Sequence, residues 1–269
     1  MTSVLNLEAY LDRIQWGGGT APTFATLAGL LKAHMSWIHF ENLDVLLGRP
    51  IRLDLDSLQK KLIRNRRGGY CFEHGTLFAA VLDRLGFRTT PHTARVVLFN
   101  PRKASPRTHM FLKVTFPEGE FIVDPGLGGL APRFPIHLSD GAVEHVGSAT
   151  HWMIRDEPYW VLRVKTGEKV VDAWVSTLDP DNLVDFEMGN HYAATFPGST
   201  FVNRIMLRAF TPEGRVTLMN RDLTIWRGNE ACSMQLPDRG TLRAMLVEHF
   251  GFDLPEVDQL RVPSIPEWA

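Results

Sequence analysis

The chain has 269 residues, of which 44% are hydrophobic and 22% are charged, and its formal net charge at pH 7 is −1. This is an ordinary globular composition, which argues against long disordered segments, and the near-zero charge argues against nucleic acid or an anionic membrane as a partner. No apolar run approaches the roughly 18 residues of a membrane-spanning helix and the N-terminus has no signal pattern, so we expect a cytoplasmic protein.

Four helices are predicted in the first third of the chain, because apolar residues recur there at helical spacing. The first begins after Asn6 and stops at the glycines of residues 17–19, and the second begins after Thr23. The third is expected behind Asp56, and the fourth ends at Gly86.

Beyond Gly86 the pattern changes to short β-branched and aromatic segments separated by turn residues. The strands predicted in the middle of the chain cover residues 93–99, 109–116, 120–124, 159–166 and 170–177. In the last part, strands are predicted over residues 201–210, 214–220 and 222–228, and a helix over 241–252. Helices followed by strands and then by a small mixed part predict an α+β fold.

Cys71 is one of only two cysteines, and in "RRGGYCFEHG" it follows a glycine pair and Tyr70 and precedes a predicted helix. The free N–H groups and positive dipole end of a helix lower the pKa of a thiol and make it nucleophilic. From this cysteine alone, inert packing is the commoner outcome, and we interpret Cys232 as packing. Cys71 and His74 in "CxxH" are too few ligands for zinc, so no metal is expected.

A thiol nucleophile also needs a base and a group that orients the base. His109 opens one predicted strand, and Asp124 ends the next. A two-residue turn at 118–119 would place Asp124 opposite Lys113, about 13 Å along the strand from His109 and too far for a hydrogen bond. A bulge, a different turn or a bend at 125–126 is needed to join them. An exposed histidine and a turn aspartate remain the alternative.

The glycines of "DPGLGG" indicate either close approach of a ligand to the backbone or a plain turn. A dinucleotide-binding fingerprint is excluded, because Pro132 and Pro135 prevent the helix that it requires. An acyl or phosphate-bearing ligand is the functional interpretation.

The segments "HFENLDVLLG", "RGGYCFEHG", "THMFLKV", "VDPGLGG", "FPGSTF" and "HFGFDLPE" together resemble the arylamine N-acetyltransferases over nearly the whole chain. The resemblance implies one family domain with a cysteine-proteinase-like catalytic core. Its parts would be a helical bundle carrying the nucleophile over residues 1–88, a β-barrel carrying the histidine and aspartate over 89–199, and an α/β lid over 200–269.

The resemblance also implies roles for individual residues. The catalytic triad would be Cys71, His109 and Asp124, with Arg67 paired to Glu41 as structural support. The residues implied to contact coenzyme A are Gly126, Gly128, Gly129, Lys103 and Ser199. Those implied to line the acceptor pocket are Phe40, Val96, Leu127 and Phe201. Each pocket position could equally be core, and a solvated lysine is the commoner state of Lys103.

The implied reaction is ping-pong transfer of acetyl from acetyl-CoA, as co-substrate, through an acetyl-Cys71 intermediate to an arylamine or arylhydrazine, in xenobiotic metabolism. The chain departs from the family pattern at His39, Gly75, Pro125 and Leu127. Two other functions stay open: a cysteine hydrolase or transglutaminase-like enzyme with the same triad, and a non-enzymatic binding protein. The physiological amine, the acyl chain length and the oligomeric state are left open by the sequence.

Overall fold

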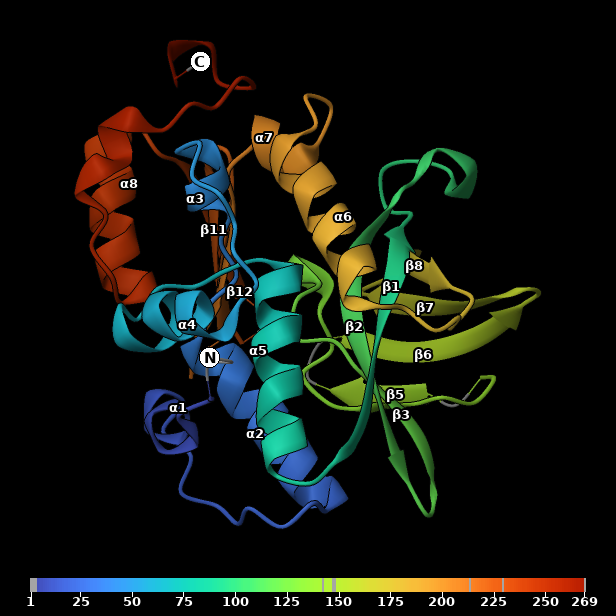
Figure 1. Ribbon diagram of the computed structural model, residues 1–269. Coiled ribbons are helices and arrows are strands. Elements are labelled where there is room, and N and C mark those ends of the chain that lie inside the picture. Colours follow the sequence, from blue (N-terminus) through green and yellow to red (C-terminus); the bar gives the residue numbers. More distant parts are fainter. Residues whose placement is uncertain (1–3, 142, 147–148, 213, 229, 269) are drawn as a thin grey trace.

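The computed structural model describes residues 4–141, 143–146, 149–212, 214–228 and 230–268. Its N-terminal part is helical (Figure 1), and α5 lies between the other helices and the strands. The helices there are α1 (Leu7–Arg13), α2 (Phe24–Trp37), α3 (Leu43–Leu46), α4 (Leu55–Leu58), a π-helix (Gln59–Arg64) and α5 (Cys71–Arg84).

The helix ends show why these segments begin and stop where they do. The side chain of Asn6 accepts a hydrogen bond from the N–H of Ala9, and the next helix has the same kind of cap at Thr23, as predicted. Helix α4, the third of the predicted helices, is capped by Asp54 instead of Asp56. The side chain of Asp54 accepts a hydrogen bond from the backbone N–H three residues later. Gly86 has a φ of +83°, which lets the chain leave α5 and enter the first strand.

The middle of the chain forms a strongly curved antiparallel sheet. Its strands are β1 (Arg88–Val96), β2 (Arg107–Phe116), β3 (Gly119–Val123), β4 (Ile136–His137), β5 (Val143–Val146), β6 (Ala149–Asp156), β7 (Tyr159–Thr166) and β8 (Lys169–Ser176). Their order in the sheet is β4-β3-β2-β1-β8-β7-β6-β5. Asp140, just after β4, pairs with Met153 in β6, so the two ends of the sheet meet in a nearly closed barrel.

After the barrel come two helices, a second sheet and a helical tail. They are α6 (Leu183–Thr195), α7 (Thr200–Asn203), β9 (Met206–Phe210), β10 (Gly214–Met219), β11 (Asp222–Arg227), β12 (Glu230–Gln235) and α8 (Arg239–Met245). A π-helix (Leu246–Phe250) and 3₁₀ turns at Pro255–Gln259 and Pro266–Trp268 complete this part. Further 3₁₀ turns lie at Arg102–Ala104 and Gly128–Leu130.

The last part corrects two sequence-based predictions. The strand expected over residues 201–210 is a helical turn followed by the shorter β9, because the side chain of Ser199 caps α7. Cys232 does not pack in the interior; it is exposed on β12, the edge strand of the second sheet. Helix α6 and strands β5, β6 and β12 had no counterpart in the sequence patterns.

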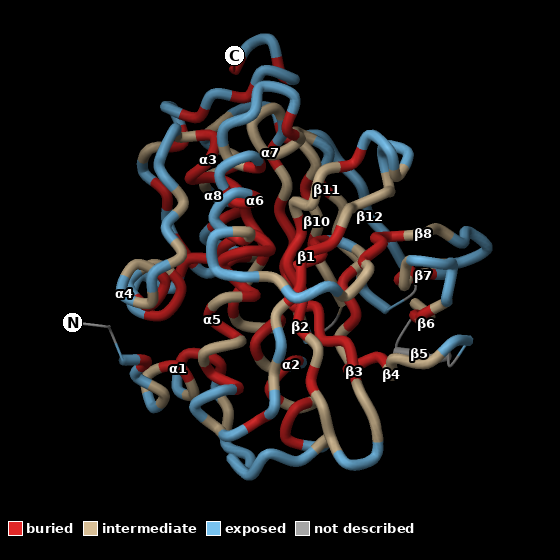
Figure 2. Tube along the Cα trace, turned by 45° about the vertical axis from the view of Figure 1, so that its right-hand side comes forward, coloured by how far each residue is buried: buried red, intermediate tan, exposed pale blue. Residues whose placement is uncertain are grey.

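Two hydrophobic cores organise the molecule, and the α+β fold of bundle, barrel and lid is confirmed. The larger core is shared by the helices and the barrel, and the smaller one by the second sheet, α8 and the C-terminal tail. Figure 2 shows the buried trace running from α5 through β1 and β2. Leu43 and Leu46 of α3 belong to the smaller core, so this early helix packs against the end of the chain. Among the described residues, no helix is long and apolar enough to cross a membrane.

Candidate active site

Cys71 is the first residue of α5 and is almost completely buried, with 2% of its surface exposed. The glycine pair before it is required by packing: a Cβ at Gly68 would lie 2.1 Å from the carbonyl oxygen of His39. A β-bulge between Ala94 and Arg95 leaves Thr108 unpaired on β2. The carbonyl oxygen of Thr108 lies 3.6 Å from the sulfur of Cys71, so the bulge brings β2 against this cysteine.

The hairpin of β2 and β3 has a different register from the simplest one. Phe116 pairs with Gly119, so the two-residue turn is 117–118 instead of 118–119. This shift places Asp124, one residue past β3, opposite Phe111 and two residues from His109 on the same face. The different turn therefore brings Asp124 two residues closer to His109 along the strand than the idealised register predicted.

His109 and Asp124 form a buried, charge-assisted hydrogen bond. Nε2 of His109 lies 2.8 Å from Oδ2 of Asp124, and the two side chains are 3% and 0% exposed. Burial by itself lowers the pKa of His109, but the charge and hydrogen bond of Asp124, then the hydrogen bond and charge of Cys71, raise that pKa to about 10. His109 is therefore an imidazolium at neutral pH, a cation beside the sulfur of Cys71.

Asp124 is fixed by three donors. Besides His109, the indole Nε1 of Trp174 donates to Oδ2 at 2.9 Å, and the backbone N–H of Gly126 donates to Oδ1 at 3.2 Å. A Cβ at Gly126 would lie 2.5 Å from the Cα of Cys71. Only glycine therefore lets the end of the hairpin reach the start of α5, which brings Asp124 and His109 close to Cys71.

A buried charge network holds the loop before Cys71. Arg67 donates from Nε and Nη2 to Oε1 of Glu41 at 3.0 and 2.7 Å. Lys61 contacts carboxylate oxygens of Asp44 and Glu73 at 2.8 Å each. Glu73 in turn accepts from the N–H of Tyr70 at 3.0 Å, which ties the network to the residue before the nucleophile.

Three histidines near the site form a second, uncharged arrangement. Nε2 of His34 lies 2.8 Å from Nδ1 of His74, whose Nε2 lies 3.2 Å from the carbonyl oxygen of His39. Tyr10 closes the chain with its hydroxyl 2.9 Å from Nδ1 of His34. Burial is the main cause that lowers the pKa of all three imidazoles, to about 3 for His39 and His74.

The proton positions in this chain follow from chemistry. A carbonyl oxygen only accepts, so the Nε2 of His74 must carry the hydrogen and its Nδ1 must accept. The Nε2 of His34 is then a donor, and the hydroxyl of Tyr10 must donate to the other nitrogen of that ring. The series of hydrogen bonds from Tyr10 in α1 to His74 in α5 thus allows only one tautomer of each of its two imidazoles.

The residues implied to line an acceptor pocket lie partly together. The rings of Phe40 and Phe201 are 6.2 Å apart, and a Cβ at Gly128 would touch the ring of Phe40 at 3.7 Å. Leu127 is buried in the same core as Phe40 and Cys71. Val96, the last residue of β1, pairs with Trp174, whose indole N–H donates to Asp124.

The residues implied to contact coenzyme A differ in their surroundings. Gly128 and Gly129 form the 3₁₀ turn after the triad aspartate, and nothing lies within 4 Å of a Cβ built on Gly129. Lys103 is exposed in the turn between β1 and β2. Ser199 is buried: its hydroxyl donates to the carbonyl of Ala193 at 2.6 Å and accepts from the N–H of Phe201.

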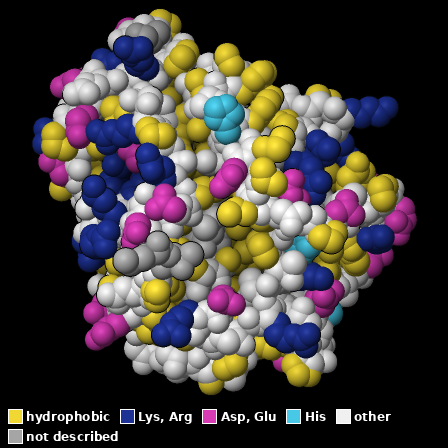
Figure 3. Space-filling view, in the orientation of Figure 1, with side chains coloured by type: hydrophobic (Ala, Val, Ile, Leu, Met, Phe, Trp, Pro, Cys, Tyr) yellow, Lys and Arg dark blue, Asp and Glu magenta, His cyan; other side chains and the backbone are white. Residues whose placement is uncertain are grey.

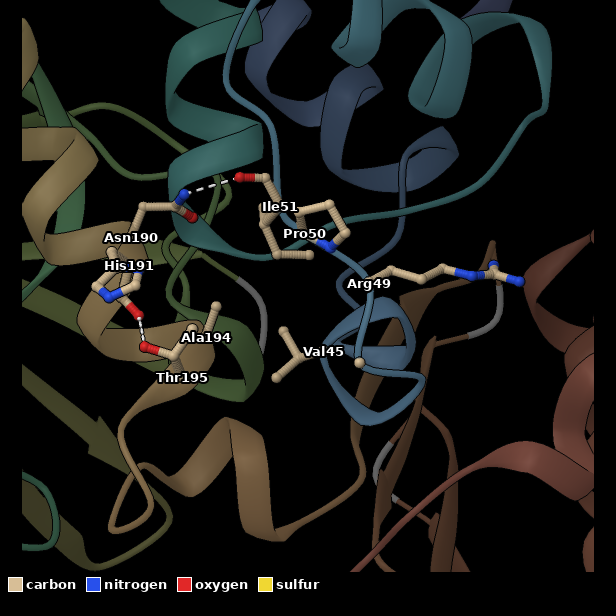
Figure 4. Close-up of a pocket in the computed structure, with 9 residues that line it drawn as sticks. Val45, Arg49, Pro50, Ile51, Asn190, His191, Ala194 and Thr195 are labelled. Carbon is tan, nitrogen blue, oxygen red and sulfur yellow. Dashed lines mark hydrogen bonds between the residues drawn. The ribbon is translucent and has the colours of Figure 1, made fainter.

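A pocket of about 440 Å³ lies between the segment after α3 and the C-terminal half of α6 (Figure 4). Asn190 spans it by donating to the carbonyl of Ile51 at 2.9 Å, and its backbone and side-chain oxygens accept from the hydroxyl of Tyr70. Figure 3 shows hydrophobic side chains gathered over this part of the surface, and Met188 of α6 is 68% exposed. The pocket contains none of the triad residues.

Two of the departures from the family pattern have a packing reason. A Cβ at Gly75 would lie 2.9 Å from the side chain of Met110, the residue after His109, so a larger residue there requires that side chain to shift. His39 places its ring 5.4 Å from that of Phe250, which connects the bundle to the lid. Nothing in the structure explains Pro125.

The sequence patterns missed three residues that shape the site. Trp174 lay inside the strand predicted over residues 170–177, Thr108 lay directly before another predicted strand, and His34 had no assigned role. The only available signals were a tryptophan in a buried strand and a histidine on an apolar helical stripe. Among the described residues, no group of three or more His, Cys, Asp or Glu is arranged to hold a metal.

Known proteins resemble this chain in both sequence and fold. The sequence profile of a family described as N-acetyltransferase matches residues 23–259. The chain is 36% identical over 258 residues to the arylamine N-acetyltransferase of Escherichia coli K12, covering 95% of this chain and 91% of that one. The structure of the Mycobacterium marinum arylamine N-acetyltransferase superposes with a TM-score of 0.89 at 34% identity, covering 94% of each chain. Its complex with CoA gives a TM-score of 0.88, with the same identity and coverage.

Proposed function

Since this chain belongs to the arylamine N-acetyltransferase family, we propose that it transfers an acetyl group from acetyl-CoA to an arylamine or arylhydrazine through a thioester on Cys71. The observation that carries the proposal is the buried contact of Cys71, His109 and Asp124 at the N-terminus of α5. A thiolate paired with an imidazolium is a nucleophile at neutral pH.

In the first half-reaction, the thiolate of Cys71 attacks the carbonyl carbon of acetyl-CoA. Negative charge develops on the carbonyl oxygen, and backbone N–H groups at the start of α5 stabilise it. The carbon–sulfur bond to coenzyme A breaks, His109 protonates the departing thiolate, and acetyl-Cys71 remains. Asp124 keeps the imidazole oriented during both proton transfers.

In the second half-reaction, the amine takes the place that coenzyme A has left. Its nitrogen attacks the thioester of acetyl-Cys71, and neutral His109 accepts the proton that the nitrogen loses. The carbon–sulfur bond breaks, which restores the thiolate–imidazolium pair. Because both substrates react in turn with one thiol, the kinetics are ping-pong.

Further parts of the proposal concern the contacts and the location. Coenzyme A would lie against Gly128 and Gly129, whose turn is open, and the acceptor ring against Phe40 and Phe201. We assign lesser roles to Lys103 and Ser199. Lys103 is exposed to solvent, and the hydroxyl of Ser199 already donates a hydrogen bond to a backbone carbonyl. Two free cysteines suit a reducing compartment, so we propose the cytoplasm.

The deciding experiment is the intact-protein mass after mixing with acetyl-CoA in the absence of an acceptor. The wild type should gain one acetyl group, Cys71→Ala should gain none, and an anisidine should remove the group from the wild type. Cys232→Ala is the matched control and should behave like the wild type, since Cys232 is exposed on β12. A wild-type protein that stays unmodified while Cys71 is rapidly alkylated would overturn the proposal in favour of a hydrolase.

A further inference from the structure

Strand β9 presents a buried arginine to the interface between the two cores. Its alternate residues Leu207 and Ala209 belong to the smaller core, whereas Phe210 belongs to the larger one. Since side chains alternate along a strand, Arg208 points the same way as Phe210, toward the core that contains Cys71. The backbone of Arg208 pairs with that of Phe40 through hydrogen bonds of 3.0 and 2.9 Å.

The guanidinium group of Arg208 has no hydrogen-bond partner among the described residues. Arg208 is 1% exposed, and Nε, Nη1 and Nη2 are all buried without an acceptor. Buried charges in folded proteins are paired, because an ion removed from water without compensation costs several kcal/mol. Contact with the ring of Phe210, 4.4 Å from the guanidinium carbon, supplies only part of this compensation.

A second arginine adds to the positive charge. The guanidinium carbon of Arg133 lies 4.3 Å from the centre of the same Phe210 ring, and its Nε is also buried without an acceptor. Burial, followed by the charge of Arg133, lowers the pKa of Arg208 to about 9, with Asp124 opposing this change. Arg208 therefore remains a cation at neutral pH, and a carboxylate that pairs with it is lacking among the described residues.

We propose that Arg208 and Arg133 form a binding site for a small monoanion of carboxylate size beside the ring of Phe210. The site lies between β9, Phe40 and the 3₁₀ turn Gly128–Leu130, which β9 contacts. A planar guanidinium binds a carboxylate through two parallel hydrogen bonds. The anion is either free in solution or the carboxylate of an aromatic acceptor. The second source rests on the proposed function, and the first does not.

The first test measures stability and needs no turnover. The thermal midpoint of the wild type is followed while acetate replaces a bulky organic anion at constant ionic strength. A saturable rise is expected, because a ligand that binds only the folded state stabilises it. Arg208→Met should abolish the rise, and without acetate its midpoint should equal or exceed that of the wild type, since an unpaired buried charge has been removed.

Two further variants keep this test decisive. Arg239→Met is the matched control: Arg239 also contacts a ring, that of Trp268 at 5.0 Å, but it donates to the carbonyl of Leu260. It should leave the acetate response unchanged. Arg208→Lys retains the charge without the paired donors, and should raise the acetate concentration at half-saturation by about tenfold. A wild-type midpoint that does not depend on acetate, or a response that survives in Arg208→Met, overturns the proposal.

The second test identifies the source of the anion. The rate at which acetyl-Cys71 is discharged is compared for 4-aminobenzoate and its uncharged methyl ester. If the acceptor supplies the carboxylate, Arg208→Met should slow the acid relative to the ester by about tenfold or more. An unchanged ratio with an intact acetate response assigns the site to a free anion. If acetyl-Cys71 never forms but the acetate response is present, the proposed function fails and the anion site stands.

Discussion

Two buried histidines, His109 of β2 and His74 of α5, have pKa values that are shifted in opposite directions. On the barrel side, the pKa of His109 is raised to about 10, whereas on the bundle side that of His74 is lowered to about 3. Both rings are buried, and burial lowers the pKa of each. The difference is that His109 faces the carboxylate of Asp124, while His74 faces another imidazole and a carbonyl. In this molecule the partner, and not the depth, decides which histidine can act on a thiol.

The largest effect on activity should come from removing the negative charge beside His109, so that its surroundings resemble those of His74. Asp124→Asn removes the charge that keeps the proton on His109, and the amide also disturbs the hydrogen bonds from Trp174 and Gly126. We expect the kcat/KM for acetyl transfer to fall on the order of 10⁴-fold. Asp181→Asn is the control, because Asp181 is a carboxylate bonded to Thr93 elsewhere in the barrel. Near-normal activity of Asp124→Asn would contradict this account of His109.

The second prediction concerns stability at alkaline pH. Folded His109 keeps its proton up to a pKa of about 10, whereas the unfolded chain loses it near 6.5. The stabilisation is fully present below pH 6.5 and is lost as the pH rises toward 10, with a slope of at most about 1.4 kcal/mol per pH unit. Urea unfolding between pH 6 and 10 should show this slope in the wild type and a shallower one in His109→Gln. His74→Gln should keep the wild-type slope in this range; equal slopes in all three proteins would refute the assignment.

The third prediction concerns the bundle side. His74→Leu leaves the Nε2–H of His34 without its acceptor, which should lower the free energy of unfolding by about 1–3 kcal/mol. The wild type should also lose stability as the pH falls from 6.5 toward 3, because the unfolded histidine takes up a proton that the folded one refuses. Urea unfolding at pH 7 and pH 5 measures both effects. Between pH 7 and pH 5, the free energy of unfolding should fall less in His74→Leu than in the wild type.

The smallest effect on stability should come from Tyr10, the residue that begins the series of hydrogen bonds through His34 and His74. Tyr10→Phe removes only the hydroxyl that donates to Nδ1 of His34, and the ring keeps its packing. We expect a loss of about 1 kcal/mol in the free energy of unfolding, the net value of one buried hydrogen bond. Acetyl transfer should be unaffected at saturating substrate. A loss of activity without a loss of stability would mean that the chain acts on catalysis directly.

Local features of the chain were predictable where neighbours along the sequence create them. Asn6 and Thr23 cap the helices that follow them, and β7 has the bounds expected from its residue pattern. The cap at Asp54 was missed because the segment has a second carboxylate at Asp56, and both residues are exposed. The helical turn after Ser199 was missed because its β-branched and aromatic residues also suit a strand. Cys232 shows the reverse error: its residue type suggested burial, but the edge position of its strand leaves it exposed.

The residue patterns alone predicted the order of helices before strands, and the motifs indicated the family, both of which are confirmed. The assignment of Cys71, His109 and Asp124 as a triad, which the same motifs imply, stays a prediction. The patterns did not determine that Asp124 reaches His109, because moving the turn by one residue shifts the pairing by two and decides that distance. Nor did they determine the protonation of any histidine or the unpaired charge of Arg208. These depend on which groups from distant segments exclude water together, and Coulomb energies and desolvation act through space and not along the chain.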